Sequence, residues 1–158
     1  MTARRSAEEQ TRLEAALTHM FEHSIHFNEV LGLKVDSLAP AGVRLRLPMR
    51  KDLIGHFSTG RLHGGAISAT LDALGGLALM VALAERHPAD TADQVMHRFG
   101  RFGTIDLRVD YLRPGMGTEF VGTAEVTRLG GRVGSVLSRL HNEQGTLIAT
   151  SSAAYVVA

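Results

Sequence analysis

The pattern of hydrophobic and polar positions divides this chain into an amphipathic helix, a hairpin, a long apolar helix and four further strands. Apolar side chains recur at helical spacing from about Ser6 to His23, and Glu9 three residues after Ser6 makes a capping-box pattern. A linking segment is expected around 27–31. Residues 33–38 and 42–49 then predict a hairpin, because apolar residues alternate with arginines in its second half.

The most unusual stretch is 62–83, which is apolar on nearly every face of a helix. Its length is typical of a helix and not of a strand. A membrane would accommodate such a helix, but Asp72 near its middle and the lack of flanking basic clusters argue against a membrane span. We therefore expect a central helix buried on all sides.

The remaining apolar positions predict strands that are joined by tight turns. The loop 51–61 leads into the central helix, and 87–103, which follows it, is polar, contains Pro88 and is expected to be mobile. Alternating segments at 104–113, 118–128, 132–141 and 146–157 complete the chain. The economical arrangement is an α+β fold in which an antiparallel sheet wraps around the central helix.

Two features of the central helix could carry chemistry. Asp72 is a carboxylate on an apolar helix that has no neighbouring Lys or Arg, so it must be hydrogen-bonded, face a wet cleft or be shared with another chain. Gly64 and Gly65 lie in the first turn, where backbone N–H groups lack intrahelical partners and a ligand can approach closely. An oxygen that gains negative charge would be stabilised there. A purely structural role for Asp72, or tight packing at the glycines, is the alternative.

The spacing between these features predicts an assembly. His63 and Asp72 are nine residues apart, which is about 13 Å along a helix. One chain therefore cannot bring both ends to one reacting atom. Two copies of the helix lying antiparallel across a two-fold axis would do so twice. We expect a homodimer with shared sites, and a dimer of dimers is also compatible with the sequence.

Composition excludes several classes of function. A net charge of +1 and 5% aromatic residues disfavour nucleic-acid binding, and the absence of cysteine excludes disulfides, thiolate metal sites and cysteine nucleophiles. Arg4 and Arg5 are followed by polar residues and not by the apolar region of an export signal, so we expect a cytoplasmic protein. The His19–His23 segment has an H-x-x-E-H pattern but no evident third ligand, and no metal site is expected.

Four motifs in order resemble one known family. They are His63-Gly64-Gly65 with Asp72 nine positions after the His, the IGHF stretch from Ile54, the TIDLRVDYLRPG stretch from Thr104, and the closing strand ending AAYVV. The chain resembles the hotdog-fold acyl-CoA thioesterases of the branch related to PaaI. The resemblance covers Gly32 to the C-terminus and implies one hotdog domain over 1–158, with 1–31 as a helical extension.

The resemblance implies roles for individual residues. The residue matching Asp72 is the catalytic general base or nucleophile and acts across the dimer interface, while the N–H matching Gly64 holds the thioester oxygen. The residue matching His63 sets up that turn, and the one matching Thr104 orients the water or the carboxylate. Gly65 would contact the substrate. The family also suggests basic residues for the phosphates of coenzyme A, here Arg113 and Arg132, although plain surface charge is an alternative for both.

One position departs from the family pattern. Many relatives have an Asn in the loop before the HGG motif, and this chain has His56 there. A histidine can donate a hydrogen bond as an amide can, but the charge of an ordinary histidine changes near neutral pH, so we expect a different substrate or a different pH optimum. A loop histidine in solvent is the alternative.

The expected reaction is hydrolysis of acyl-CoA thioesters to free acid and coenzyme A, with coenzyme A as part of the substrate and no other cofactor. The chain lacks the G-x-S-x-G motif of serine hydrolases. Two alternatives remain: a hotdog hydratase or dehydratase in which His56 or His63 works with Asp72, and a non-catalytic acyl-CoA binding protein. The acyl chain length is not readable from the sequence.

Overall fold

One six-stranded antiparallel sheet forms the body of the molecule in the computed structural model, which describes residues 4–158. Residues 1–3 of the predicted domain lie outside the described residues. The strands are, in spatial order, β1 (Lys34–Ser37), β2 (Val43–Pro48), β6 (Glu119–Leu129), β7 (Val133–Asn142), β8 (Leu147–Val156) and β5 (Gly103–Tyr111). The predicted strands are all present, with bounds shifted by one or two residues. The predicted loop 51–61 contains a 3-10 turn (Lys51–Leu53) and a small second sheet of β3 (Ile54–His56) and β4 (Arg61–Leu62).

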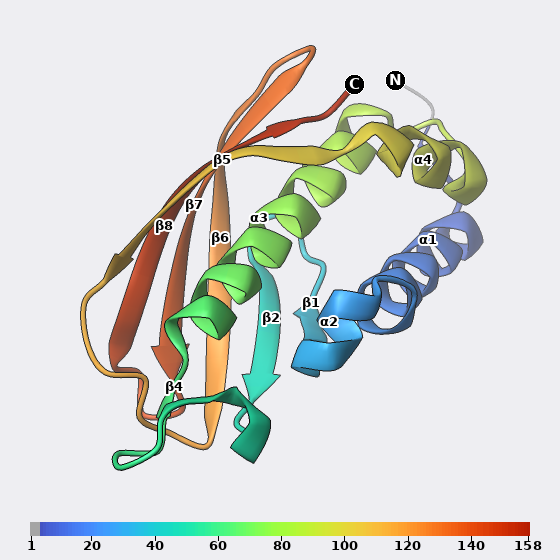
Figure 1. Cartoon of the computed structure of the whole chain (residues 1–158). Helices are drawn as coiled ribbons and strands as arrows, with labels where there is room; N and C mark the ends of the chain where they lie inside the picture. Colours follow the sequence, from blue (N-terminus) through green and yellow to red (C-terminus); the bar gives the residue numbers. More distant parts are fainter. Residues whose placement is uncertain (1–3) are drawn as a thin grey trace.

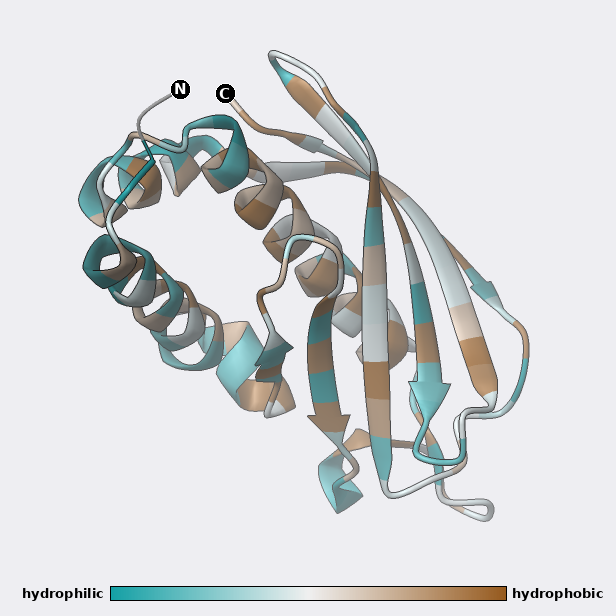
Figure 2. Cartoon of the chain, turned by 180° about the vertical axis from the view of Figure 1, so that it is seen from behind, coloured by the Kyte–Doolittle hydropathy of each residue, from teal (hydrophilic) through white to brown (hydrophobic). Residues whose placement is uncertain are grey.

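The long helix α3 (Gly64–Arg86) crosses one face of this sheet, as Figure 1 shows. Leucines of α3 meet the apolar side chains of the strands, and Figure 2 shows hydrophobic and polar bands alternating along β2. This alternation puts one face of each strand against the helix. The fully buried side chains of this core include Leu45, Leu47, Leu71, Leu74, Leu77 and Phe120. The predicted arrangement of an antiparallel sheet around a long central helix is confirmed.

One stripe of α3 is not covered by its own chain, which corrects the expectation of burial on every side. The residues of this stripe are half-exposed and mostly small: Ser68, Ala69, Asp72, Ala73 and Gly76. By length and composition α3 could cross a membrane, yet 67% of its most apolar window is buried inside the domain. The curved sheet covers one side of the helix only.

The N-terminal segment is helical throughout, which confirms one expectation and corrects another. Helix α1 (Ala7–His19) continues as a π-helical turn at Met20–Ser24, in the place of the helix predicted for 6–23. Ser6 caps α1 by accepting a hydrogen bond from the Glu9 N–H at 3.2 Å. The expected linker at 27–31 was wrong: helix α2 (His26–Leu31) forms there and ends at Gly32, whose φ of 74° favours glycine.

The polar segment 87–103, for which no helix was predicted, contains regular structure. Helix α4 (Ala92–Arg98) and a 3-10 turn (Phe99–Arg101) form there, and a complete capping box between Thr91 and Gln94 starts α4. The residues that α4 and the turn bury, such as Val95 and Phe99, are too widely spaced among charged residues to stand out as a pattern.

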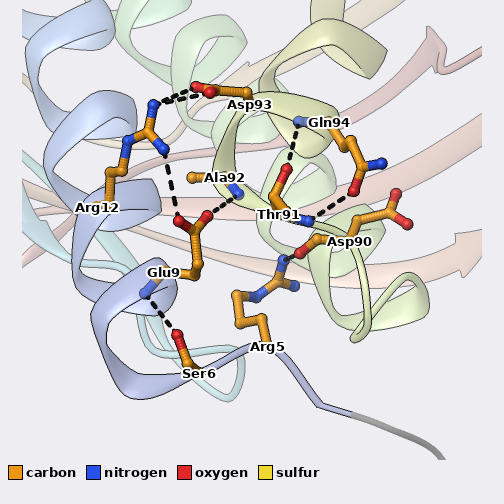
Figure 3. A network of polar contacts seen from close by, with 9 residues as sticks. All are labelled: Arg5, Ser6, Glu9, Arg12, Asp90, Thr91, Ala92, Asp93 and Gln94. Atoms are coloured by element: carbon orange, nitrogen blue, oxygen red, sulfur yellow. Dashed lines mark hydrogen bonds and ion pairs between the residues drawn. The ribbon is translucent and has the colours of Figure 1, made fainter.

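Polar contacts hold α4 against α1, as Figure 3 shows. Arg12 pairs with Asp93 at 2.7 Å, and the Glu9 carboxylate accepts a hydrogen bond from the Ala92 N–H at 2.7 Å. Glu9 therefore does not return to Ser6, as a capping box would require. Glu9 links α1 to α4 instead. Together with the Arg12–Asp93 pair, this contact fixes the N-terminal helices beside the end of α3.

Candidate active site

Asp72 lies in the middle of the uncovered stripe of α3, and two hydroxyl groups fix its position. The Thr104 hydroxyl on β5 donates a hydrogen bond to Asp72 Oδ1 at 2.8 Å. The Tyr155 hydroxyl on β8 donates to the Asp72 backbone oxygen at 2.8 Å. Tyr155 comes so close to Gly75 that a Cβ atom on Gly75 would overlap the hydroxyl oxygen of Tyr155. Gly75 is therefore required for the approach of Tyr155 to the helix.

Tyr155 remains protonated in this position. Burial raises the pKa of its hydroxyl, and the negative charge of Asp72 raises the pKa further, because both disfavour a phenolate there. Tyr155 thus stays a hydrogen-bond donor over the whole working range of an enzyme. The second oxygen of Asp72 is left for a proton or a ligand, since Thr104 holds the first.

A cavity of about 250 Å³ opens in front of Asp72, and we call it the Asp72 cavity. Its walls come from the N-terminal helices, from α3 and from the segment that enters β5. Asp72 is its one charged group, and aromatic rings supply much of the remaining surface. The lining residues are Phe21, Ile25, Phe27, Asn28, Ala69, Asp72, Ala73, Gly76, Met80, Phe102, Gly103, Thr104 and Tyr155.

The first turn of α3 forms a second structured position. His63 is the N-cap, and its Nδ1 accepts a hydrogen bond from the Gly65 N–H at 2.8 Å. A Cβ atom on Gly65 would lie 2.9 Å from this nitrogen, so glycine lets the ring fold over the helix end. The Tyr111 hydroxyl donates to the Gly64 carbonyl at 3.1 Å. Within residues 4–158 the Gly64 N–H donates to no protein acceptor, and it points away from the helix at its positive end.

A cavity of about 370 Å³ adjoins this turn, and we call it the Gly64 cavity. Two arginines from different segments border it: Arg61 from β4 and Arg113 from the turn after β5. No acidic side chain belongs to its wall, which consists of Arg61, Leu62, Gly64, Ile67, Tyr111, Leu112, Arg113, Pro114 and Gly115.

The two cavities have no lining residue in common. Asp72 and Thr104 are brought together in one, while Gly64 belongs to the other, next to His63 and Gly65. Eight residues of helix separate Gly64 from Asp72, which is about 12 Å. A single chain thus presents the carboxylate and the free N–H as two separate half-sites.

The other predicted residues lie outside these two groups. His56, on β3, is half-buried, contacts the Ser58 hydroxyl through Nδ1 at 2.9 Å and stacks on the Phe57 ring. It lines neither cavity. Arg132 precedes β7, beside the last residues of β8, whereas Arg113 contacts Leu147 at the first residue of β8. The two arginines therefore occupy opposite ends of one strand.

Several site residues were missed by reasoning from the sequence. Tyr111 and Tyr155 fix the two half-sites through their hydroxyl groups, and Phe21, Phe27 and Asn28 bring the N-terminal helices into the Asp72 cavity. The pair Gly75-Gly76 inside a helix was a usable signal, because a helical glycine often marks a close approach. Nothing local to the N-terminal helices signals that they border Asp72.

No metal site is formed in the part of the chain that the structure describes, where no group of three or more metal-binding side chains occurs. In the H-x-x-E-H segment, Glu22 instead accepts hydrogen bonds from Lys34 at 2.9 Å and from the Val35 N–H at 2.8 Å. Burial acts to raise the pKa of Glu22, but these hydrogen bonds and the charge of Lys34 outweigh it, and the pKa is lowered. Glu22 therefore ties the π-helical turn to β1.

Comparisons with known proteins show to which family the chain belongs. The family model of the thioesterase superfamily matches residues 59–149. The medium/long-chain acyl-CoA thioesterase YigI of Salmonella typhimurium is 36% identical over 157 residues, which cover 99% of each chain. YigI of Escherichia coli strain K12 is 35% identical over the same share.

The fold is also found among solved structures. A protein from Shewanella oneidensis related to the thioesterase superfamily superposes with a TM-score of 0.89 at 36% identity, covering 98% of this chain and all of the other. The narrower assignment to the branch related to PaaI stays a prediction. The match over more than half of the chain and the full-length relatives show that this chain is an enzyme of the thioesterase superfamily with the hotdog fold.

Proposed function

We propose that this protein hydrolyses medium- or long-chain acyl-CoA thioesters in active sites shared between two subunits. The observation that carries the proposal is the division of the site: a carboxylate held by Thr104 in an apolar cavity, and a free helix N–H in a separate cationic one. The full-length relatives named for this activity support the choice of substrate.

The chemistry needs only a base and a donor. The Gly64 N–H binds the thioester oxygen and stabilises the negative charge that develops on it. Asp72 takes a proton from water, whose oxygen bonds to the carbonyl carbon, or attacks that carbon directly and is later released by water. The carbon–sulfur bond breaks, and the thiolate of coenzyme A takes up a proton. The products are the free acid and coenzyme A.

Two surfaces support the dimer. The uncovered stripe of α3 consists of small residues around Asp72, which allow another helix to approach closely. Strand β5 pairs with β8 on one side, and within residues 4–158 no strand pairs with its other edge. Ile105 on this edge strand is 55% exposed. An exposed edge strand is a template for pairing with another chain, and antiparallel pairing of two copies of α3 puts Asp72 of one near Gly64 of the other.

The two cavities match the two ends of the substrate. The aromatic wall of the Asp72 cavity suits an aliphatic acyl chain, and Arg61 and Arg113 at the Gly64 cavity suit the phosphates of coenzyme A. We assign Arg132 to the same phosphates, from the partner's side. The reaction requires no resident metal or redox cofactor, and the cytoplasm is the compartment that we propose.

The geometry favours hydrolysis over hydration of an enoyl thioester. That chemistry places a histidine next to the carboxylate, but His63 is occupied by the Gly65 N–H and His56 contacts Ser58. Neither histidine lines the Asp72 cavity.

A complementation experiment tests the shared site. Asp72→Asn removes the base, and Gly64→Pro removes the N–H at the first helical position, where proline fits. Each variant alone should lose at least about a hundredfold in kcat/KM. After unfolding and refolding of a 1:1 mixture, half of the dimers are mixed and have one intact site of two, so about one quarter of wild-type activity should return.

Thiol release from C4 to C18 acyl-CoA substrates is the readout, and refolded wild type is the control. Mixed variants that stay inactive while mixed dimers form would overturn the shared site. Wild-type protein that releases no thiol from any acyl-CoA would overturn the proposed substrate class.

A further inference from the structure

Asn28 is a buried polar side chain without a hydrogen-bond partner. It lies on α2, is 5% exposed, and its Nδ2 contacts no acceptor within residues 4–158. Its backbone oxygen accepts a hydrogen bond from the Leu33 N–H at 3.1 Å. Within residues 4–158, only its side-chain amide therefore lacks a hydrogen-bond partner. The residue also lines the Asp72 cavity.

An unpaired buried amide destabilises a protein by about 1–3 kcal/mol, and such groups usually have a partner. The walls of this cavity offer few polar groups besides Asn28. The Thr104 hydroxyl donates to Asp72 Oδ1, and the Tyr155 hydroxyl donates to the Asp72 backbone oxygen. Among the lining residues, the second Asp72 oxygen and the Asn28 side-chain amide are the side-chain groups for which no hydrogen-bond partner is found within residues 4–158.

A medium- or long-chain acyl group offers nothing polar to Asn28, because its chain is hydrocarbon. The polar atoms that reach this cavity during the proposed reaction are those of the thioester and of the attacking water. The thioester oxygen is assigned to the Gly64 N–H of the other half-site. A water held in a cavity typically makes two to four hydrogen bonds, about three on average, and Asp72 and Asn28 together supply two of them.

We propose that Asn28 is a further catalytic residue, whose amide binds the water that Asp72 activates. This inference rests on the proposed function and gives the N-terminal helices a part in the chemistry. Asp72 accepts a proton from the water, and Asn28 bonds to the same water and fixes its direction of attack. Either end of the amide can serve, because its orientation is set by the partner that it finds.

The variant Asn28→Leu separates this role from a structural one. Leucine has nearly the same size, favours a helix and removes the unpaired polar group. If Asn28 only fills space, Asn28→Leu should keep full activity and raise the melting temperature. If Asn28 binds the water, kcat should fall about tenfold to a hundredfold with KM within about twofold, while the melting temperature stays equal or rises.

Ser138→Ala is the matched control. Ser138 is also buried, at 2% exposure, and its hydroxyl also lacks a partner within residues 4–158, but it lies on β7 and lines neither cavity. It should change neither kcat nor KM. Should Asn28→Leu not fold, Asn28→Ala is measured in the same way.

The results distinguish this inference from the proposed function. An active wild type, an inactive Asp72→Asn and a fully active Asn28→Leu would overturn the role of Asn28 alone. An unchanged kcat with a raised KM would also overturn it, because Asn28 would then bind the acyl group. A wild type without thioesterase activity would overturn the proposed function itself.

Discussion

The two cavities beside α3 differ in size, charge and origin. The Gly64 cavity is bordered by two arginines and by turns that follow strands, and it contains the positive end of a helix. The Asp72 cavity is smaller, contains one carboxylate, and takes four aromatic rings from three separate parts of the chain. By their chemistry, the Gly64 cavity suits an anionic oxygen, and the Asp72 cavity suits hydrocarbon beside a carboxylate.

The two cavities are also formed by different parts of the molecule. The Gly64 cavity is made by the start of α3 and by β4 and β5, which belong to the helix-and-sheet body. The Asp72 cavity is completed by Phe21, Phe27 and Asn28 from the N-terminal helices. We therefore propose that the reaction type depends on the helix-and-sheet body, and that substrate choice depends on the N-terminal helices that border the Asp72 cavity.

The sharpest test of the Gly64 cavity compares two substitutions at one position. Gly64→Pro and Gly64→Ala both add a Cβ atom, which would lie 3.3 Å from the Tyr111 ring, but only proline removes the N–H. His63 has ψ of 136°, which suits a residue before proline. We expect kcat to fall about a hundredfold to a thousandfold more for proline than for alanine.

Steady-state kinetics, with circular dichroism to check the fold, provide the measurement. Equal activities of the two variants would show that the N–H does not bind the thioester oxygen.

The Asp72 cavity should control acyl selectivity. Phe27 lines this cavity, whereas Val30 on the same helix is similarly exposed but does not line it. Phe27→Ala should raise KM for a C14 acyl-CoA about tenfold, because contact with the chain is lost, and should leave a C4 substrate nearly unchanged. Val30→Ala is the control and should alter neither. A uniform change across chain lengths would argue against an acyl-binding role.

The Gly64 cavity should bind the nucleotide end of the substrate. Arg113→Ala is expected to raise KM for acyl-CoA about threefold to tenfold, since a charge-assisted contact with phosphate is lost. The same acyl group on N-acetylcysteamine, which has no phosphate, should be hydrolysed with unchanged KM. Arg139→Ala, at an exposed position of β7, is the control. An equal rise in KM for both substrates would show that Arg113 does not bind the phosphates of coenzyme A.

The stability of the fold should depend on pH through Glu22, which links the π-helical turn to β1. The folded-state pKa of Glu22 lies below its usual value of 4.5, so the ionised carboxylate stabilises the fold above that pH. Glu22→Gln should lower the free energy of unfolding by about 1 kcal/mol at pH 7. This deficit should disappear as the pH falls through the folded-state pKa, where wild-type Glu22 is protonated too.

Urea titrations between pH 3 and pH 7 measure this difference, with Glu14→Gln on the exposed face of α1 as the control. A deficit that stays constant over the whole range would assign Glu22 a packing role only.

Strong local patterns made most of the body predictable from the sequence. The alternation around Leu45 and Leu47 and the length of the apolar helix were sufficient for the sheet and for α3. The separation of Gly64 from Asp72 followed from helix geometry alone. These features depend on spacing along one segment, which a sequence displays directly.

The walls of the cavities were not predictable in the same way. Tyr155 reaches Asp72 from a strand 83 residues later in the chain, and Phe27 and Asn28 reach the same cavity from a helix that resembled a linker. Helix α4 could not be recognised in the sequence, because the Thr91 cap and its two buried residues are spread among charged residues. Contacts between distant segments depend on how helices pack, and one sequence carries little information about that.

The open edge of β5 has a consequence for evolution. If each reaction centre combines a carboxylate from one polypeptide with an amide from another, two related genes with compatible edges can build hybrid enzymes. Mutations in the N-terminal helices of one duplicated gene product could then change its acyl preference. The unchanged partner would still supply the turn at Gly64 that binds the anionic oxygen. The range of substrates would then depend on which two polypeptides form the dimer, as well as on mutations in each gene.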